Sequence, residues 1–203
     1  MSGKPWDQRL AGVLVRPLKD SAVHPNHLTV LSLAFGALAA ALFAFGGPGA
    51  AGWAALVFML AVFTDHTDGE LARLAGKSSR FGYYFDYLAG AANYTLLFTA
   101  IGLGLYLAGA GAWALVLGLA AGLANPVIVT LRLIMEHRHG PEAVEHPSGI
   151  GFELEDFIYL IGPITWFAGI ELFLIPFGLG ALGYLAWTVW EVRRWRAANP
   201  PIT

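Results

Sequence analysis

Residues 65–90 read DHTDGELARLAGKSSRFGYYFDYLAG, and they join two apolar stretches that are each long enough to cross a membrane. Three aspartates, Asp65, Asp68 and Asp86, fall within this segment. An ionisable side chain at the bilayer centre costs roughly 3 kcal/mol or more, and it usually marks a functional site. Carboxylates this close together repel one another unless a cation neutralises them. The segment therefore predicts a binding site for a divalent metal ion.

The composition indicates an integral membrane protein. Of the 203 residues, 57% are hydrophobic and only 13% are charged, and the mean hydropathy is +0.60. Soluble proteins contain about 45–50% apolar and about 25% charged residues. The chain has no cysteine, which excludes disulfides and thiolate metal ligands. We expect the protein to contact membrane lipids and to have no nucleic-acid partner.

Six apolar segments approach the ~20 residues that a transmembrane helix requires. They lie near 28–46, 51–74, 83–108, 112–135, 154–171 and 174–194. Before them, Trp6 and other apolar residues alternate with charges at near-helical spacing, which predicts an amphipathic surface helix over 1–22. A partly disordered tail is the alternative. The expected fold is all-α, with residues 1–203 forming one membrane domain and six helices spanning 28–194.

The distribution of cations predicts the orientation in the membrane. If the N-terminus is cytoplasmic and the chain crosses six times, all twelve lysines and arginines lie inside and the external turns contain none. Both termini and the acidic segment are then cytoplasmic, and a bacterial inner membrane is the expected location. Gly118 and Gly122 allow close helix packing, either within the chain or across the homodimer that we expect.

Helical spacing allows the acidic side chains to share a cation. Asp65 and Asp68 are three residues apart, so they share one face of a helix. Residues 74–81 turn the chain, and the next helix returns antiparallel with Asp86 opposite the first two carboxylates. Oxygen ligands of this kind suit Mg²⁺, Mn²⁺ or Ca²⁺. Because Mg²⁺ commonly combines carboxylates with phosphate oxygens, a diphosphate compound is the expected substrate.

The pattern D-x2-D-G-x2-A-R-x8-G-x3-D over 65–86 resembles the signature of the CDP-alcohol phosphatidyltransferase family of membrane enzymes. The entry to the first span, which contains Asn26 and Thr29, is also similar to that of the family. The resemblance implies a phospholipid-synthesising transferase that moves a phosphatidyl or phospho-alcohol group to a hydroxyl acceptor and releases CMP. The implied donor is CDP-diacylglycerol or a CDP-alcohol, and the implied acceptor is an alcohol or a lipid.

The same resemblance implies a role for each motif residue. One or two Mg²⁺ or Mn²⁺ ions would be bound by Asp65, Asp68 and Asp86, and Asp86 would also take part in catalysis. Arg73 would pair with phosphate or orient a carboxylate. The residues implied to bind the CDP-linked donor are Asp65, Asp68, Gly69, Ala72, Arg73, Gly82, Asn26 and Thr29.

One position departs from the family pattern. The pattern continues to a fourth aspartate, usually a base or a metal ligand, where this chain has Gly90. Loss of a general base typically slows a reaction about 10²–10⁴-fold. We expect another carboxylate to compensate, and Glu153, Glu155 and Asp156 cluster at the cytoplasmic end of the fifth predicted span. Glu153 and Asp156 share a face and are the candidate catalytic residues, although acids at a helix start also favour the helix dipole.

Other interpretations of the sequence stay open. Gly90 is also consistent with a pseudoenzyme that binds nucleotide and metal as a partner or regulator, or with a substitution introduced to trap substrate. A cation transporter is disfavoured because few polar groups lie mid-membrane. His137 and His139 could bind a metal, but a solvated loop explains them better. Asn93, seven residues after Asp86, predicts a hydrogen bond between helices.

Overall fold

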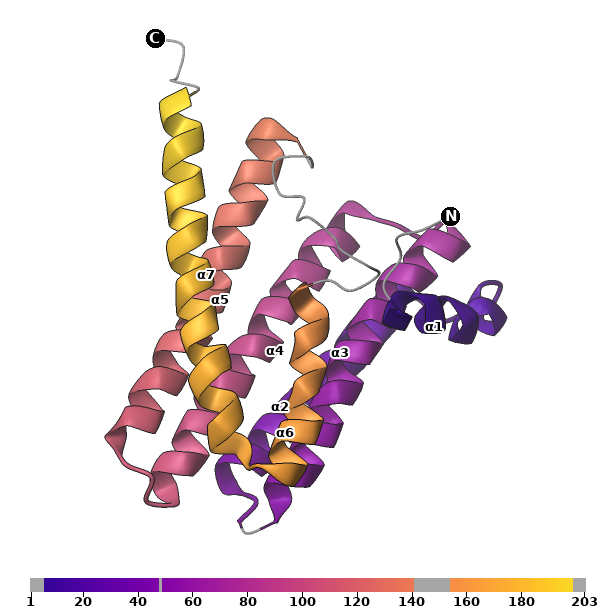
Figure 1. The fold of residues 1–203 in the computed structure, drawn as a ribbon. Coiled ribbons are helices and arrows are strands. Elements are labelled where there is room, and N and C mark those ends of the chain that lie inside the picture. The colour runs from indigo at the N-terminus through magenta and orange to yellow at the C-terminus, as the bar shows by residue number, and fades with distance from the viewer. Residues whose placement is uncertain (1–5, 48, 141–153, 199–203) are drawn as a thin grey trace.

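Helices make up nearly all of the chain that the computed structural model describes, which is residues 6–47, 49–140 and 154–198 (Figure 1). No strand occurs in these ranges. In chain order the elements are α1 Trp6–Leu14, η1 Arg16–Leu18, α2 Pro25–Phe45, α3 Ala50–Ala75, α4 Arg80–Leu107, α5 Ala112–His139, η3 Leu154–Leu160, α6 Ile161–Phe167 and α7 Ile170–Ala198.

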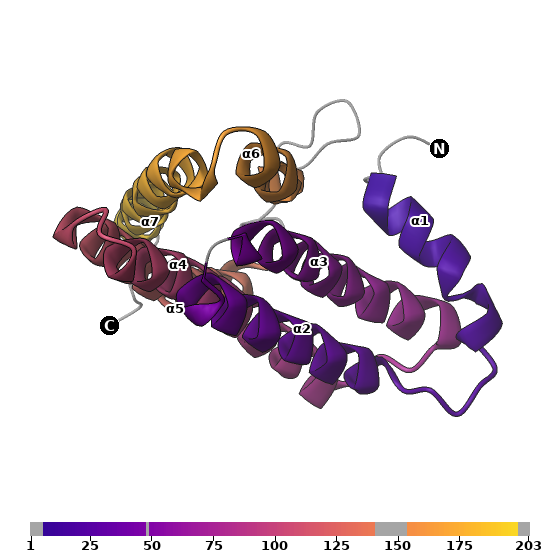
Figure 2. The same cartoon turned by 90° about the horizontal axis from the view of Figure 1, so that it is seen from below.

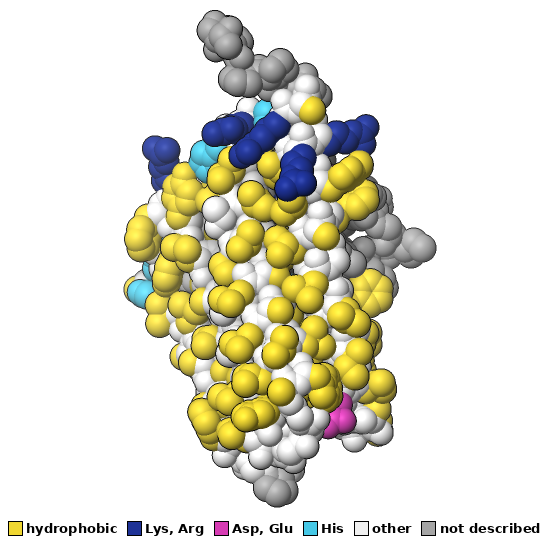
Figure 3. All heavy atoms as spheres, turned by 90° about the vertical axis from the view of Figure 1, so that its left-hand side faces the viewer, with side chains coloured by type: hydrophobic (Ala, Val, Ile, Leu, Met, Phe, Trp, Pro, Cys, Tyr) yellow, Lys and Arg dark blue, Asp and Glu magenta, His cyan; other side chains and the backbone are white. Residues whose placement is uncertain are grey.

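Within the described ranges, five helices are long and apolar enough to cross a membrane: α2, α3, α4, α5 and α7. Apolar side chains cover the side of the molecule, and lysines and arginines gather at the end where α5 and α7 finish (Figure 3). An apolar flank with cations at one end is the surface that a bilayer requires. The prediction of an all-α, multi-pass integral membrane protein is therefore confirmed.

The segment predicted as the fifth span, 154–171, is shorter than expected. It forms η3 and α6. Its apolar helical part, Phe157–Phe167, is shorter than the ~20 residues that a membrane-spanning helix requires. A helix of that length rises roughly 17 Å, against a hydrocarbon core of about 30 Å. Gly169, with φ of 93°, ends this segment and starts α7 at Ile170. Hydropathy alone could not locate that break, and a sixth crossing stays a prediction.

Helix α2 packs against both α3 and α4, while α4 packs against α5 and α5 against α7. Small residues allow the backbones to approach closely. A Cβ on Gly118 would lie 2.5 Å from the carbonyl oxygen of Phe98, and one on Gly122 would lie 2.6 Å from Thr99 Oγ1. Both neighbours belong to α4. The Gly118 and Gly122 pattern therefore serves packing within the chain, and the homodimer stays a prediction.

The N-terminal segment forms a short amphipathic helix, α1, that packs along the outer side of α3 (Figure 2). Ala11 and Val15 are buried against the bundle, whereas Leu10 and Val13 are exposed. The Nζ atom of Lys77 donates hydrogen bonds to two backbone carbonyls between η1 and α2, at 2.9 and 3.1 Å. These bonds attach the N-terminal segment to the turn between α3 and α4, which is where the acidic motif lies.

Candidate functional site

The acidic motif lies on the end of α3 and the start of α4, which a four-residue turn connects. Gly76 adopts the left-handed conformation, with φ of 61°, and ends α3. Ser79 caps α4 because its hydroxyl oxygen accepts a hydrogen bond from the backbone N–H of Gly82, at 2.9 Å. The turn sends α4 back along α3, so both halves of the motif lie at one end of the bundle.

The three motif aspartates come together as predicted. One carboxylate oxygen from each of Asp65, Asp68 and Asp86 lies within 4.8 Å of the other two. Asp68 is buried, and the other two are half-buried. Three negatively charged oxygen donors from two helices fit a hard divalent cation such as Mg²⁺ or Mn²⁺. Without such a cation, the three carboxylates would repel one another.

Helix α2 supplies side chains that orient these carboxylates. The Thr29 hydroxyl donates a hydrogen bond to Asp68 Oδ2. The Ser32 hydroxyl lies 3.3 Å from Asp65 Oδ1 and 3.0 Å from the Ala61 carbonyl oxygen. Asn93 Nδ2 donates to Ser32 Oγ at 2.9 Å, which confirms the predicted hydrogen bond between helices. Sequence analysis missed Ser32, although it lies three residues after Thr29 and therefore on the same face of α2.

A cleft of about 170 Å³ opens beside the aspartates. With the exception of Asp65, the residues that the motif and the α2 entry nominated within the described ranges line it: Asn26, Thr29, Asp68, Gly69, Ala72, Arg73, Gly82 and Asp86. A Cβ on Gly82 would lie 3.1 Å from Ser79 Oγ and 3.2 Å from Asn26 Oδ1. The absence of a side chain at Gly82 therefore keeps this wall of the cleft open.

Arg73 forms an ion pair with Glu70. Its Nη2 atom donates to Glu70 Oε1 at 2.8 Å, and Glu70 is buried while the Arg73 side chain is 56% exposed. The guanidinium group is thus anchored on one side and solvent-accessible on the other, at the edge of the cleft. This arrangement leaves further N–H donors of Arg73 available to a phosphate.

The space beside position 90, where the family pattern has its fourth aspartate, is empty. Gly90 lies one turn after Asp86 on α4, and a Cβ at this position would meet no atom within 4 Å. Of the carboxylates predicted to compensate, Glu153 lies outside the described residues. Asp156 lies in η3, but its side chain is not among those described. Their catalytic role stays a prediction.

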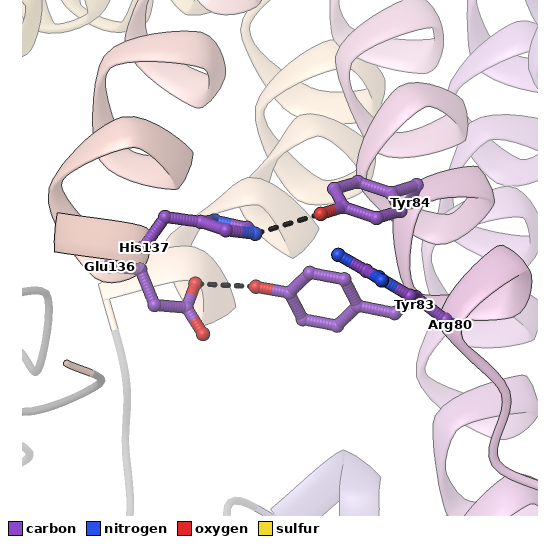
Figure 4. A pocket seen from close by; sticks show the side chains of 5 residues that line it. All are labelled: Arg80, Tyr83, Tyr84, Glu136 and His137. Atoms are coloured by element: carbon purple, nitrogen blue, oxygen red, sulfur yellow. Dashed lines mark hydrogen bonds between the residues drawn. The ribbon is translucent and has the colours of Figure 1, made fainter.

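A second cleft, of about 300 Å³, lies between α4 and α5 and is lined by Arg80, Tyr83, Tyr84, Glu136 and His137 (Figure 4). The Tyr83 hydroxyl donates to Glu136 Oε2 at 2.6 Å, and the Tyr84 hydroxyl lies 2.7 Å from His137 Nε2. Tyr83 lines both clefts. Sequence analysis missed this cleft because its two walls are about fifty residues apart in the chain.

The interpretation of residues 136–139 as a solvated loop was wrong. These residues form the last turn of α5, which ends at His139 and is followed by Gly140 with φ of 85°. The apolar pattern stops at Met135, but hydrogen bonds to tyrosines of α4 hold the added turn in place. Histidine and arginine in a last turn also suit the helix dipole.

A comparison with protein families agrees with this geometry. The family model described as CDP-alcohol phosphatidyltransferase matches residues 22–192. The chain belongs to the CDP-alcohol phosphatidyltransferase family. The match includes both sides of the aspartate cluster and the start of α2. No curated protein matches the chain. Membership of the CDP-alcohol phosphatidyltransferase family supports a transferase activity in phospholipid synthesis, with a CDP-alcohol donor and an alcohol or lipid acceptor.

Proposed function

We propose that the protein is a divalent-metal-dependent phosphotransferase that moves a phosphatidyl or phospho-alcohol group from a CDP-linked donor to a hydroxyl acceptor and releases CMP. The observation that carries this proposal is the convergence of Asp65, Asp68 and Asp86 within 4.8 Å, beside a cleft lined by the other motif residues. Family membership supports the general reaction. The metal requirement is supported by the all-oxygen donor set.

In this proposal Asp65, Asp68 and Asp86 hold one or two Mg²⁺ or Mn²⁺ ions, which would neutralise charge on the donor diphosphate and on departing CMP. Thr29 and Ser32 keep two of the carboxylates oriented through their hydroxyl groups. Asn26, Gly69, Ala72 and Gly82 line the space for the nucleotide. The exposed side of Arg73 pairs with a phosphate oxygen.

We place this site at the cytoplasmic face of the membrane, with both termini on that side and a bacterial inner membrane as the location. The proposal is supported by the position of the cations: the ends of α3, α5 and α7 and the start of α4 lie together at one end of the bundle (Figure 1). Lys and Arg residues flank these helix ends in the sequence. The positive-inside rule assigns such an end to the cytoplasm, where soluble nucleotides are available.

A second candidate function is favoured by one observation, the glycine at position 90. A protein that lacks the family's fourth aspartate, with open space where it would stand, could bind the nucleotide and metal without turning the substrate over. It would then act as a partner or regulator of an active enzyme.

An assay of CMP release separates these candidates. The purified protein is incubated in lipid nanodiscs with CDP-diacylglycerol, Mg²⁺ or Mn²⁺, and a panel of small alcohols; a parallel set uses CDP-alcohols with diacylglycerol. Metal-dependent release of CMP supports the transferase. Metal-dependent nucleotide binding without release supports the non-catalytic candidate. Absence of both binding and release would contradict both candidates.

A further inference from the structure

We propose that Tyr83 and Glu136 together accept the proton of the attacking hydroxyl group. The family's fourth aspartate is usually assigned as a base or a metal ligand, and Gly90 can serve neither role. The inference rests on the proposed transferase function and adds the groups that take the proton. Tyr83 lines both the cleft beside the aspartates and the cleft between α4 and α5, so it connects the two.

The position of Tyr83 suits contact with an acceptor hydroxyl. Tyr83 lies three residues before Asp86 and seven before Gly90 on α4, so all three lie along one stripe of the helix. A hydroxyl that approaches a phosphate beside Asp86 along this stripe comes next to the side chain of Tyr83, which lines the same cleft, or to the open space over Gly90. The phenol oxygen can accept a hydrogen bond from this hydroxyl while it donates its own proton elsewhere.

The partner that receives the Tyr83 proton is the carboxylate of Glu136. Tyr83 and Tyr87 both donate hydrogen bonds to Glu136 Oε2, at 2.6 and 3.0 Å. Figure 4 shows Glu136 and Tyr83 pointing toward one another across the space between α5 and α4. Two phenol donors on one carboxylate oxygen fix its direction. The hydrogen bond from Tyr83 gives its proton a direct path to Glu136.

Other carboxylates at this end of the bundle have different partners. Asp65, Asp68 and Asp86 face one another in the cluster, and Glu70 is paired with Arg73. Glu136, by contrast, forms no ion pair with any described residue, and it lines a cleft wide enough for a small molecule, about 300 Å³. Of these carboxylates, Glu136 is the one that lines the second cleft and accepts a hydrogen bond from Tyr83, and these contacts suit proton transfer.

The acceptor hydroxyl oxygen forms a bond to the donor phosphorus, and the bond from that phosphorus to the CMP oxygen breaks, with its electron pair leaving on CMP. The hydroxyl proton moves to the Tyr83 oxygen while the Tyr83 proton moves to Glu136. Tyr83 ends neutral and Glu136 ends protonated, and Glu136 later loses the proton to water.

The test measures CMP release and ligand binding for Tyr83→Phe, Glu136→Gln and the double variant. We expect each single variant to lower kcat by about 10²–10⁴-fold, the range for loss of a general base. The double variant should be no slower than either single variant, because both remove one proton path. Binding of Mn²⁺ and of CDP should stay within about threefold of wild type. Matched controls at the opposite end of the bundle, Glu171→Gln and Tyr106→Phe, should keep wild-type activity.

A rescue experiment separates a chemical role from a structural one. Gly90→Asp restores the family pattern, and its Cβ has open space. The double variant Gly90→Asp/Glu136→Gln should have a kcat at least tenfold higher than that of Glu136→Gln alone. The inference is overturned if Glu136→Gln keeps more than a third of wild-type kcat, if rescue fails while the variant is folded, or if Glu153→Gln or Asp156→Asn alone removes activity. A wild-type protein that releases no CMP would instead contradict the transferase function itself.

Discussion

The hydroxyl group of Thr29 offers a sharp perturbation of the aspartate cluster. Thr29 is only 2% exposed, and its hydroxyl donates a hydrogen bond to Asp68 Oδ2. The substitution Thr29→Val removes this donor and keeps almost the same shape. If Asp68 is a metal ligand, the loss of its orienting hydrogen bond must weaken metal binding.

The expected magnitude follows from the type of bond. A hydrogen bond to a charged group contributes about 1.5–3 kcal/mol, and about 1.4 kcal/mol corresponds to a tenfold change in an equilibrium constant. Thr29→Val should therefore weaken Mn²⁺ binding roughly 10–150-fold. This range overlaps the loss of about 10–100-fold that is typical when a residue supporting a metal ligand is removed.

Mn²⁺ binding can be measured by titration followed by electron paramagnetic resonance of the free ion, with the protein in nanodiscs. The metal concentration that gives half-maximal CMP release provides an independent readout. Thr29→Ser keeps the hydroxyl and serves as the matched control, with Mn²⁺ affinity expected near that of wild type. An affinity within twofold of wild type for folded Thr29→Val would refute the assignment of Asp68 as an oriented ligand.

Three further predictions follow from the same geometry. Removal of divalent ions with EDTA should abolish CMP release, and Mg²⁺ or Mn²⁺ should restore it; release that survives complete chelation would count against the proposed site. Gly82→Val should raise KM for the CDP-linked donor more than tenfold because its side chain enters the cleft wall, whereas Gly183→Ala, on α7 and outside the cleft, has open space around its Cβ and should change KM little. Gly118→Ala should lower stability by about 1–3 kcal/mol through overpacking against α4, seen as a reduced Tm in detergent. The exposed Gly180→Ala, with open space around its Cβ, is the control, and equal Tm values for the two variants would contradict the packing described for α5.

The aspartate cluster could be predicted because its geometry is mainly local. Asp65 and Asp68 share a helical face by spacing alone, and a short turn necessarily brings the start of α4 back toward the end of α3. The five long spans were predictable for a similar reason, since hydropathy over about 20 residues reports burial in lipid. Both features depend on residues that are close in sequence.

The features that were missed depend on packing between distant segments. Tyr83 meets Glu136 because α4 and α5 pack side by side, with close approaches at Gly118 and Gly122, and the spacing of these glycines does not reveal which residue of α4 lies opposite Glu136. The same contacts extend α5 to His139, beyond the end of its apolar pattern. The break at Gly169 shortens an apolar stretch whose hydropathy continues across it.

The most direct test of the central claim is a structure of the protein with CDP and Mn²⁺ that locates manganese by its anomalous scattering. The account predicts a manganese peak between Asp65, Asp68 and Asp86, with carboxylate oxygens near the roughly 2.1 Å expected for a small hard cation and with the CDP diphosphate completing the coordination. A bound nucleotide with no manganese among these three side chains, or manganese bound elsewhere, would contradict it.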